Sequence, residues 1–309
     1  MISIVTCVYN EENYIQNYYH SVSSLLISLK IEFEIVFVND GSTDSSFEIL
    51  DTISRDNSNV IVVNFSRNFG KEIALTAGFE YTSGDAVIPI DVDLQEPIHL
   101  IPKFYKKWKE GYLNVIGVKK NRSYEPFLKR KLVIFFYKII SKVSKVKIIP
   151  NSSDFRMLDR KVVNEILKIR ETNRFMKGIY AFPGFSYCTV EYEVLINDSK
   201  RVSKWSTFSL WRLCLDGLFG FSSAALKIWT YFGSALIFLT IFYTLFLFLK
   251  VLIFGIEVPG YVTTIVLILM FGGAQLIAIG ILGEYIARIF EQVKGRPLYV
   301  IDKVINYKK

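Results

Sequence analysis

The sequence has few cysteines and lacks the phosphate-binding motifs of the common nucleotide-binding families. Its three cysteines, Cys7, Cys188 and Cys214, are odd in number and widely spaced, without metal-ligand spacing. This usage fits reduced thiols in a cytosolic domain. There is no G-x-x-x-x-G-K-[ST] loop and no G-x-G-x-x-G fingerprint. We therefore expect neither a typical nucleoside triphosphatase nor a typical dinucleotide-dependent oxidoreductase.

We expect no secretory signal peptide in this sequence, and no internal repeat is visible in it. The first residues, MISIVTCVYN, carry no basic stretch, and their apolar run is too short for a signal peptide. The chain has 309 residues, of which 51% are hydrophobic, and a formal net charge of +8. This length suits one large or two modest structural units.

Charged residues are absent from two long segments near the C-terminal end. Residues 228–249 and 258–283 contain none, and each segment exceeds the roughly 20 residues that a helix needs to cross a bilayer. We therefore expect two transmembrane helices, at about 228–253 and 260–285, within residues 226–287. The alternative is a buried helix pair of a soluble protein.

Positive charge flanks the outer ends of this predicted hairpin. Lys227 precedes the first span, and the loop between the spans carries Glu257, with Lys250 just before it. Six basic residues follow the second span: Arg288, Lys294, Arg296, Lys303, Lys308 and Lys309. The positive-inside rule predicts that residues 1–204 and the tail 288–309 both lie in the cytoplasm, in a multi-pass protein of a bacterial inner membrane.

Apolar runs alternate with helical patterns in the first part of the chain. We expect strands at residues 2–9, 33–40, 59–66 and 85–93, and helices after residue 13, at 72–82 and at 98–110. This alternation is typical of an α/β fold with a mostly parallel sheet and helices on both faces. Ligands of such sheets bind at the carboxyl ends of the strands. That edge gathers Asn10, Glu11, Asp40, Arg67 and Asp91.

Acidic and basic side chains at this edge are suited to a nucleoside diphosphate. In AVIPIDVDLQEP, Asp91 and Asp93 follow a buried strand, and Gln95 comes two residues later. Oxygen ligands on a loop suit Mg²⁺ or Mn²⁺ bridging substrate phosphates, although a polar turn after a strand is the simpler alternative. Arg67 and Lys71 add cations for the phosphates.

A basic segment lies between residues 119 and 147, with ten Lys and Arg against one Glu. Its apolar residues recur at helical spacing, so we expect a basic amphipathic helix at about 127–147 on an anionic membrane surface. A helix packed on the sheet is the alternative, and a nucleic-acid partner is not expected. A second amphipathic helix is expected at 205–225, leading into the first span.

Seven motifs, in order along residues 3–301, resemble those of polyprenyl-phosphate glycosyltransferases of glycosyltransferase family 2. They are VTCVYNEE, FVNDGSTD, SRNFGKEIALTAG, IPIDVDLQEP, SDFRMLDRKVV, NRFMKG and GEYIARIFEQVKGRPLYV. That branch includes bactoprenol glucosyltransferases and dolichol-phosphate mannose synthases. The predicted hairpin and the GRPLYV tail are most similar to the bactoprenol enzymes.

The resemblance implies a GT-A fold, a nucleotide-sugar donor, an undecaprenyl phosphate acceptor and a divalent cofactor, Mg²⁺ or Mn²⁺. It implies a metal site at Asp91, Asp93 and Gln95, and a catalytic role for Asp154 beside the acceptor phosphate. The donor site would comprise Tyr9, Asn10, Glu11, Asp40, Arg67, Lys71 and Asp91. The acceptor phosphate would be met by Arg122, Arg130, Arg156, Lys200 and Arg201.

The sequence departs from the family pattern in two places. Cys7 stands where the family usually has proline. The Arg-x-x-Gly-like element that usually precedes SKY is replaced by NDSKRVSKW, residues 197–205. We expect Lys200 or Arg201 to supply the missing cation there.

The resemblance predicts an inverting transfer of a hexose, with UDP-glucose as the first choice of donor, for O-antigen or cell-envelope glycan modification. GDP-mannose or another nucleotide sugar is the alternative donor. Because a phosphate acceptor is already largely ionised near neutral pH, Asp154 acts either as a general base or as a positioning group. A processive polysaccharide synthase, a non-catalytic nucleotide-binding module and a flippase subunit are the competing functions. Homo-oligomers would form through the glycines of the second span.

Overall fold

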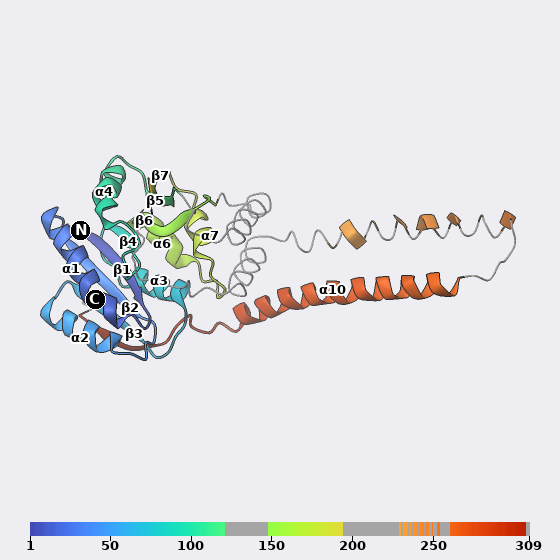
Figure 1. Ribbon diagram of the computed structural model, residues 1–309, viewed down its shortest axis with the longest axis horizontal. Helices are drawn as coiled ribbons and strands as arrows, with labels where there is room; N and C mark the ends of the chain where they lie inside the picture. Colours follow the sequence, from blue (N-terminus) through green and yellow to red (C-terminus); the bar gives the residue numbers. More distant parts are fainter. Residues whose placement is uncertain are drawn as a thin grey trace.

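The computed structural model describes residues 1–120, 148–193 and 260–306, together with scattered positions between 229 and 253. The N-terminal residues form an α/β domain, and the long helix α10 extends away from it (Figure 1). The chain then returns from α10 to the domain, because residues 301–305 pair with its sheet.

Within the described residues, eight strands form one sheet in the order β7-β5-β6-β4-β1-β2-β3-β8. Its parallel centre consists of β1 (Ile2–Val8), β2 (Phe33–Asn39), β3 (Val60–Phe65) and β4 (Ala86–Pro89). The outer strands are β5 (Asn114–Lys119), β6 (Ser152–Asp159), β7 (Tyr187–Tyr192) and β8 (Ile301–Ile305). Strand β6 is antiparallel to both of its neighbours, β7 is parallel to β5, and β8 is antiparallel to β3.

Helices cover both faces of the sheet. One face packs against α1 (Glu12–Ser28), α2 (Ser46–Asp56) and α4 (Ile101–Lys109), which follows a short 3₁₀ turn, Ile98–Leu100. The other packs against α3 (Lys71–Glu80), α6 (Arg160–Lys168) and α7 (Met176–Ala181).

The central strands have continuous apolar sequences because both of their faces are buried. Along β1, Ile4 points to the first core and Val5 to the second, and both are fully buried. In β2, Phe37 and Val38 alternate in the same way. The predicted α/β architecture with a mostly parallel central sheet is therefore confirmed.

Strand β4 is shorter than predicted. It ends at Pro89 rather than at residue 93, so Asp91 and Asp93 lie in the turn that follows. The pairing of β4 with β6 covers only Ala86 and Val87, which leaves the later residues without a strand partner on that side. Leu94 then adopts a positive φ of 53°, which reverses the chain toward Gln95.

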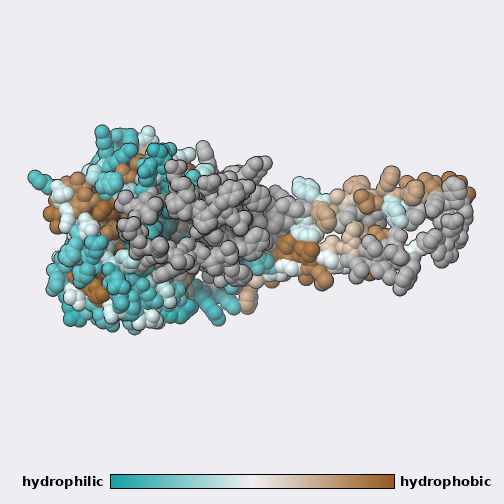
Figure 2. All heavy atoms as spheres, in the orientation of Figure 1, coloured by the Kyte–Doolittle hydropathy of each residue, from teal (hydrophilic) through white to brown (hydrophobic). Residues whose placement is uncertain are grey.

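The helix α10 (Tyr261–Val293) has 33 residues, so it is about 50 Å long at 1.5 Å per residue. Within the described residues, its segment Met270–Val293 is the one helix long and apolar enough to cross a membrane. Along this arm, most of the residues that Figure 2 colours are hydrophobic. The first expected span lies largely outside the described residues, so the two-helix hairpin remains a prediction.

The last residues are part of the sheet rather than a separate tail. Besides the pairing of β8 with β3, the ring of Tyr299 stacks on Phe65 at a centroid distance of 4.9 Å. The amide of Asn306 donates hydrogen bonds to the carbonyl oxygens of Asn57 and Val60. Of the predicted tail 288–309, residues 288–293 belong to α10, and residues 299–306 complete the edge of the α/β domain beside β3.

Candidate active site

The predicted site residues gather where the strand order reverses. Strand β1 lies between β2 and β4, so the chain adds β2 and β3 on one side of β1 and β4 on the other. Open α/β sheets bind ligands at such a reversal of strand order. Tyr9 follows β1, Asp40 follows β2, and Asp91 follows β4. The Tyr9 side chain is 43% exposed and so is available to a ligand.

Asp40 holds the loop that follows β3. Its carboxylate accepts hydrogen bonds from the backbone amides of Phe69 (2.7 Å) and Gly70 (2.9 Å) and from the side-chain amide of Asn68 (3.0 Å). Burial raises the pKa of Asp40, although the bonds from Phe69 and Gly70 oppose this. Both carboxylate oxygens accept bonds from this loop, so Asp40 holds the loop in place, and its predicted place in the donor site stays a prediction.

Gly41 permits the close approach of this loop. Its φ is +64°, and a Cβ atom there would lie 2.3 Å from the backbone carbon of Arg67. Only glycine fits both the conformation and the space. Arg67 itself stays at the surface, with its guanidinium 4.1 Å from the centroid of the Phe69 ring.

The loops after β1 and β2 are joined by hydrogen bonds. The Asn10 side chain accepts a bond from the Thr43 amide (2.8 Å), and the Glu11 amide donates to the Ser46 hydroxyl (3.1 Å). The Asp44 carboxylate accepts hydrogen bonds from the backbone amides of Ser46 and Glu12. The polar residues after these two strands therefore form one rigid rim beside the site.

Lys71 connects the two carboxylates that were assigned to donor and acceptor. Its Nζ lies 2.7 Å from Oδ1 of Asp91 and 3.5 Å from Oδ2 of Asp154. The surrounding protein lowers the pKa of the Lys71 ammonium, but Asp91, Asp154 and Glu96 outweigh this and raise it well above its ordinary value. The Lys71 ammonium, at the start of α3, thus contacts Asp154 of β6 and Asp91 of the turn after β4.

Asp154 is surrounded by cations. Burial raises the pKa of its carboxyl, but Lys71, Arg156 and Lys177 outweigh burial and bring the pKa below its usual value. Asp154 is therefore a carboxylate at neutral pH, and a weak base.

Two further acids lie beside this centre. Burial and the charge of Asp91 raise the pKa of Glu96 to about 8, and Glu96 accepts a hydrogen bond from the Asp91 amide at 3.1 Å. Burial and the charge of Asp154 raise the pKa of Glu72 to about 7. Glu72 accepts a bond from the Met176 amide (3.0 Å) and so joins α3 to the start of α7.

The turn after β4 supplies the donor set of a hard cation. Asp91 is 41% exposed and already binds one cation, and Asp93 accepts a hydrogen bond from the Gln95 amide at 3.2 Å. Two carboxylates and one amide oxygen fit Mg²⁺ or Mn²⁺ with further ligands from phosphate and water. Among the described residues, no three or more His, Cys, Asp or Glu form a ready-made metal cluster.

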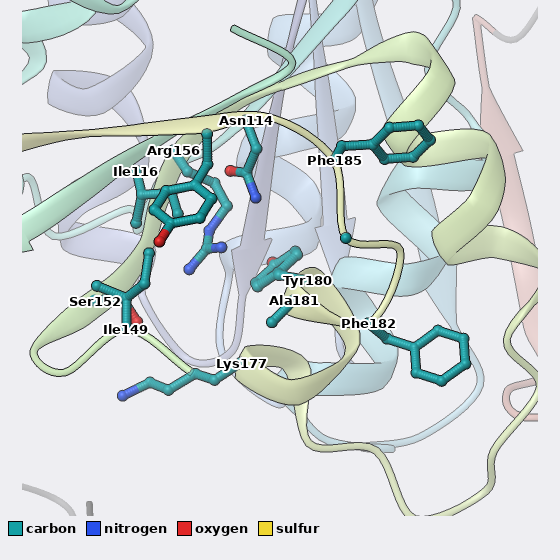
Figure 3. Close-up of a pocket in the computed structure, with 12 residues that line it drawn as sticks. Asn114, Ile116, Ile149, Ser152, Arg156, Lys177, Tyr180, Ala181, Phe182 and Phe185 are labelled. Atoms are coloured by element: carbon teal, nitrogen blue, oxygen red, sulfur yellow. The ribbon is translucent and has the colours of Figure 1, made fainter. Parts of the chain in front are cut away.

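A cavity of about 330 Å³ lies beside β6 on the Asp154 side. Its polar lining includes Arg156, Lys177, Asn114 and Tyr180, and its apolar lining includes Ile116. Arg156 and Asn114 point into it, whereas Phe182 and Phe185 turn away (Figure 3).

The cavity has buried polar groups available to a ligand. The guanidinium of Arg156 is 2% exposed and lies 3.9 Å from the centroid of the Tyr180 ring. Within the part of the chain that the structure describes, Oδ1 of Asn114 and the hydroxyl of Tyr180 have no hydrogen-bond partner. Buried polar atoms are normally satisfied, so a ligand or water is expected to meet them.

The model of the family "Glycosyl transferase family 2" matches residues 3–167. This match spans β1 to α6 and includes every described residue of the carboxylate and lysine centre except those of α7. The chain belongs to glycosyl transferase family 2. It is a glycosyltransferase with a GT-A-like α/β fold, as the motifs predicted.

Several relatives of this family 2 glycosyl transferase extend over nearly the whole chain. An uncharacterized glycosyltransferase of Synechocystis is 45% identical over 304 residues, which is 97% of this chain and 94% of the relative. The SfII prophage-derived bactoprenol glucosyl transferase of Shigella flexneri is 44% identical over 302 residues (98% and 97%). A prophage bactoprenol glucosyl transferase homolog of Escherichia coli is 42% identical over 306 residues (98% and 99%).

Among solved structures, glucosyl-3-phosphoglycerate synthase from Mycobacterium tuberculosis in complex with UDP is similar, with a TM-score of 0.46 and 19% identity. The similarity covers 70% of this chain and 79% of that one.

Some predicted parts of this glycosyl transferase lie outside the described residues. They are Arg122, Arg130, Lys200 and Arg201, the basic helix at 127–147 and the amphipathic helix at 205–225. Sequence reasoning gave no role to Glu72, Glu96 or Lys177. Glu72 adjoins Lys71, and Lys177 stands in the quoted motif NRFMKG. Their positions within the motifs could therefore have identified them.

Proposed function

We propose that this glycosyltransferase moves glucose from UDP-glucose to undecaprenyl phosphate at the cytoplasmic face of a membrane, with inversion at the sugar carbon. The observation that carries the proposal is the meeting of Asp91, Lys71 and Asp154. It puts the expected donor-side carboxylate and the expected acceptor-side carboxylate on either side of one ammonium group. The relatives named bactoprenol glucosyl transferase support the choice of sugar and lipid.

On the donor side, Asp91, Asp93 and the Gln95 side chain would hold Mg²⁺ or Mn²⁺. Such an ion supplies neutralisation of the charge that grows on the departing diphosphate. The rim formed by the loops after β1 and β2 would fix the nucleoside, with Tyr9 and Arg67 at its surface. Asp40 shapes this side of the pocket by holding the Phe69 and Gly70 amides in place.

On the acceptor side, Arg156 and Lys177 would bind the phosphate of the lipid. This phosphate is a monoester with a second pKa of about 6, so most of it is dianionic at neutral pH and already nucleophilic. Asp154 is a weak base because the surrounding cations lower its pKa. We therefore favour a positioning role for Asp154, in which it orients Lys71 and the phosphate-binding cations, over general-base catalysis.

The membrane would confine the acceptor to the plane of the active site. The predicted second span at about 260–285, which lies within α10, would cross the bilayer together with the predicted first span, and the basic residues after it would remain in the cytoplasm. Such confinement raises the effective concentration of the acceptor phosphate. The predicted basic helix at 127–147, with Arg122 and Arg130, would approach anionic lipid beside the site.

A panel of labelled nucleotide sugars tests the proposed function. Membranes containing the protein would be incubated with undecaprenyl phosphate and UDP-glucose, UDP-galactose or GDP-mannose, each labelled in the sugar. We expect label from UDP-glucose in an acid-labile lipid. Label from GDP-mannose instead would change the donor, and no labelled lipid from any donor would overturn the proposal. Membranes carrying Asp154→Asn are the matched control.

A further inference from the structure

Lys71 occupies the position beside Asp91 that the proposed function gives to a metal ion. Its Nζ lies 2.7 Å from Oδ1 and 2.8 Å from Oδ2 of Asp91, so the ammonium group contacts both carboxylate oxygens. A divalent ion bound to these oxygens would be repelled by an ammonium group at that distance. Lys71 and the ion therefore compete for Asp91.

The contact is accessible and only the side chain needs to move. The side chains of Lys71 and Asp91 are 40% and 41% exposed, so a hydrated ion reaches them from solution. The backbone of Lys71 is held at the start of α3, since the preceding Gly70 amide donates to Asp40 and the Lys71 carbonyl accepts from the Cys7 thiol. A lysine side chain has a flexible four-carbon stem that permits such an exchange.

A second anion is ready to receive the displaced ammonium. Oδ2 of Asp154 lies 3.5 Å from the same Nζ, and the Asp154 side chain is 25% exposed. The cavity beside it carries the cations Arg156 and Lys177. Moving Lys71 toward Asp154 would therefore add a third cation to the side where the acceptor phosphate would lie.

We propose that Lys71 is an exchangeable counter-ion that neutralises Asp91 before the metal and donor bind, and then moves to the acceptor side. This inference rests on the proposed function, since it takes Asp91 as a metal ligand. It adds an order of events to that function: loading of the metal and diphosphate strengthens binding of the acceptor phosphate. Lys71 is in this respect a positioning residue that links two half-sites, the donor side at Asp91 and the acceptor side at Asp154.

The first test measures metal affinity without turnover. Full-length protein in detergent would be titrated with MnCl₂ alone, and free Mn²⁺ would be followed by electron paramagnetic resonance. Lys71→Met should bind Mn²⁺ about tenfold more tightly than the wild type, the order expected when one competing charge is removed from a half-exposed carboxylate. Lys71→Arg keeps the charge and should bind like the wild type.

Lys177→Met serves as the matched control in this titration. It removes one positive charge near Asp154 and leaves the Lys71 ammonium on Asp91 in place, so its Mn²⁺ affinity should change by much less than that of Lys71→Met. Equal tightening in both variants, or wild-type affinity in Lys71→Met, would overturn the counter-ion role. Loss of Mn²⁺ binding in Asp91→Asn is required in any case. If Asp91→Asn binds Mn²⁺ normally, the metal assignment in the proposed function fails instead.

The second test measures the coupling between the half-sites. Calorimetry would give the affinity of a short, water-soluble prenyl phosphate, geranyl phosphate, with and without Mn²⁺ and UDP. The wild type should bind it several-fold more tightly when Mn²⁺ and UDP are present, and Lys71→Met should show no such gain. A wild-type affinity that does not respond to Mn²⁺ and UDP refutes the movement of Lys71.

Discussion

The substitution Asp40→Asn separates the structural role of this residue from a nucleoside contact. The Asp40 side chain is 3% exposed and accepts bonds of 2.7 Å and 2.9 Å from the Phe69 and Gly70 amides. Hydrogen bonds to a charged group contribute about 1.5–3 kcal/mol each. Asparagine keeps one acceptor oxygen but turns an NH₂ group toward a backbone amide, so one to two of these bonds are lost. We therefore expect a destabilisation of roughly 2–4 kcal/mol in the absence of any ligand.

This prediction is checked by thermal unfolding of the full-length protein in detergent without nucleotide. A loss of that size corresponds to a fall of roughly 4–16 °C in the midpoint for a domain of about 150–250 residues. Asp56→Asn is the matched control, because it is the same substitution at an exposed residue at the end of α2. A midpoint for Asp40→Asn equal to that of the control, with weakened UDP binding, would refute the structural role and favour the predicted donor contact.

Three other predictions follow from the same contacts. The pKa of Glu72 is raised from 4.5 to about 7, so the free energy of unfolding should fall as pH rises through this window, by at most about 3 kcal/mol. Glu72→Gln should flatten this pH dependence when unfolding is measured at a series of pH values, and an unchanged slope would contradict the prediction. Gln292→Ala removes the acceptor of the Thr172 amide (3.0 Å), so hydrogen exchange at Thr172 should become faster, whereas unchanged exchange would show that the contact is not maintained. Asp91→Asn and Asp93→Asn should each abolish Mn²⁺-dependent UDP binding in calorimetry and cost several kcal/mol in transfer; retained Mn²⁺ dependence would exclude them as ligands.

The central sheet and its functional edge were predictable because they depend on local patterns. Buried strands at 2–8 and 33–39 show as apolar runs, and parallel strands deliver Asp40 and Asp91 to the same edge whatever lies between them. The end of β4 was placed too late, because Ile90 and Val92 continue the apolar alternation after strand pairing with β6 has stopped. Apolar periodicity reports burial, and both residues are buried in the turn.

Contacts between distant segments were not predictable from local patterns. Strand β8 follows the long α10 helix, and its residue Asp302 accepts a hydrogen bond from the side-chain amide of Asn64, 238 residues earlier in the chain. The meeting of Lys71 with Asp154 likewise depends on how α3 and β6 pack. From the sequence, Lys71 was a cation for phosphates, and its pairing with Asp91 required the three-dimensional arrangement.

The most direct test of the proposed reaction follows two labels of one donor into the lipid product. The protein in nanodiscs with undecaprenyl phosphate would receive UDP-glucose carrying radioactive carbon in the glucose and radioactive phosphorus in the β-phosphate. In the proposed reaction the acceptor phosphate attacks the sugar carbon and the diphosphate departs intact with uridine. We therefore predict a lipid that contains the carbon label and no phosphorus label. A lipid that contains both labels, or neither, would contradict the proposed glycosyl transfer.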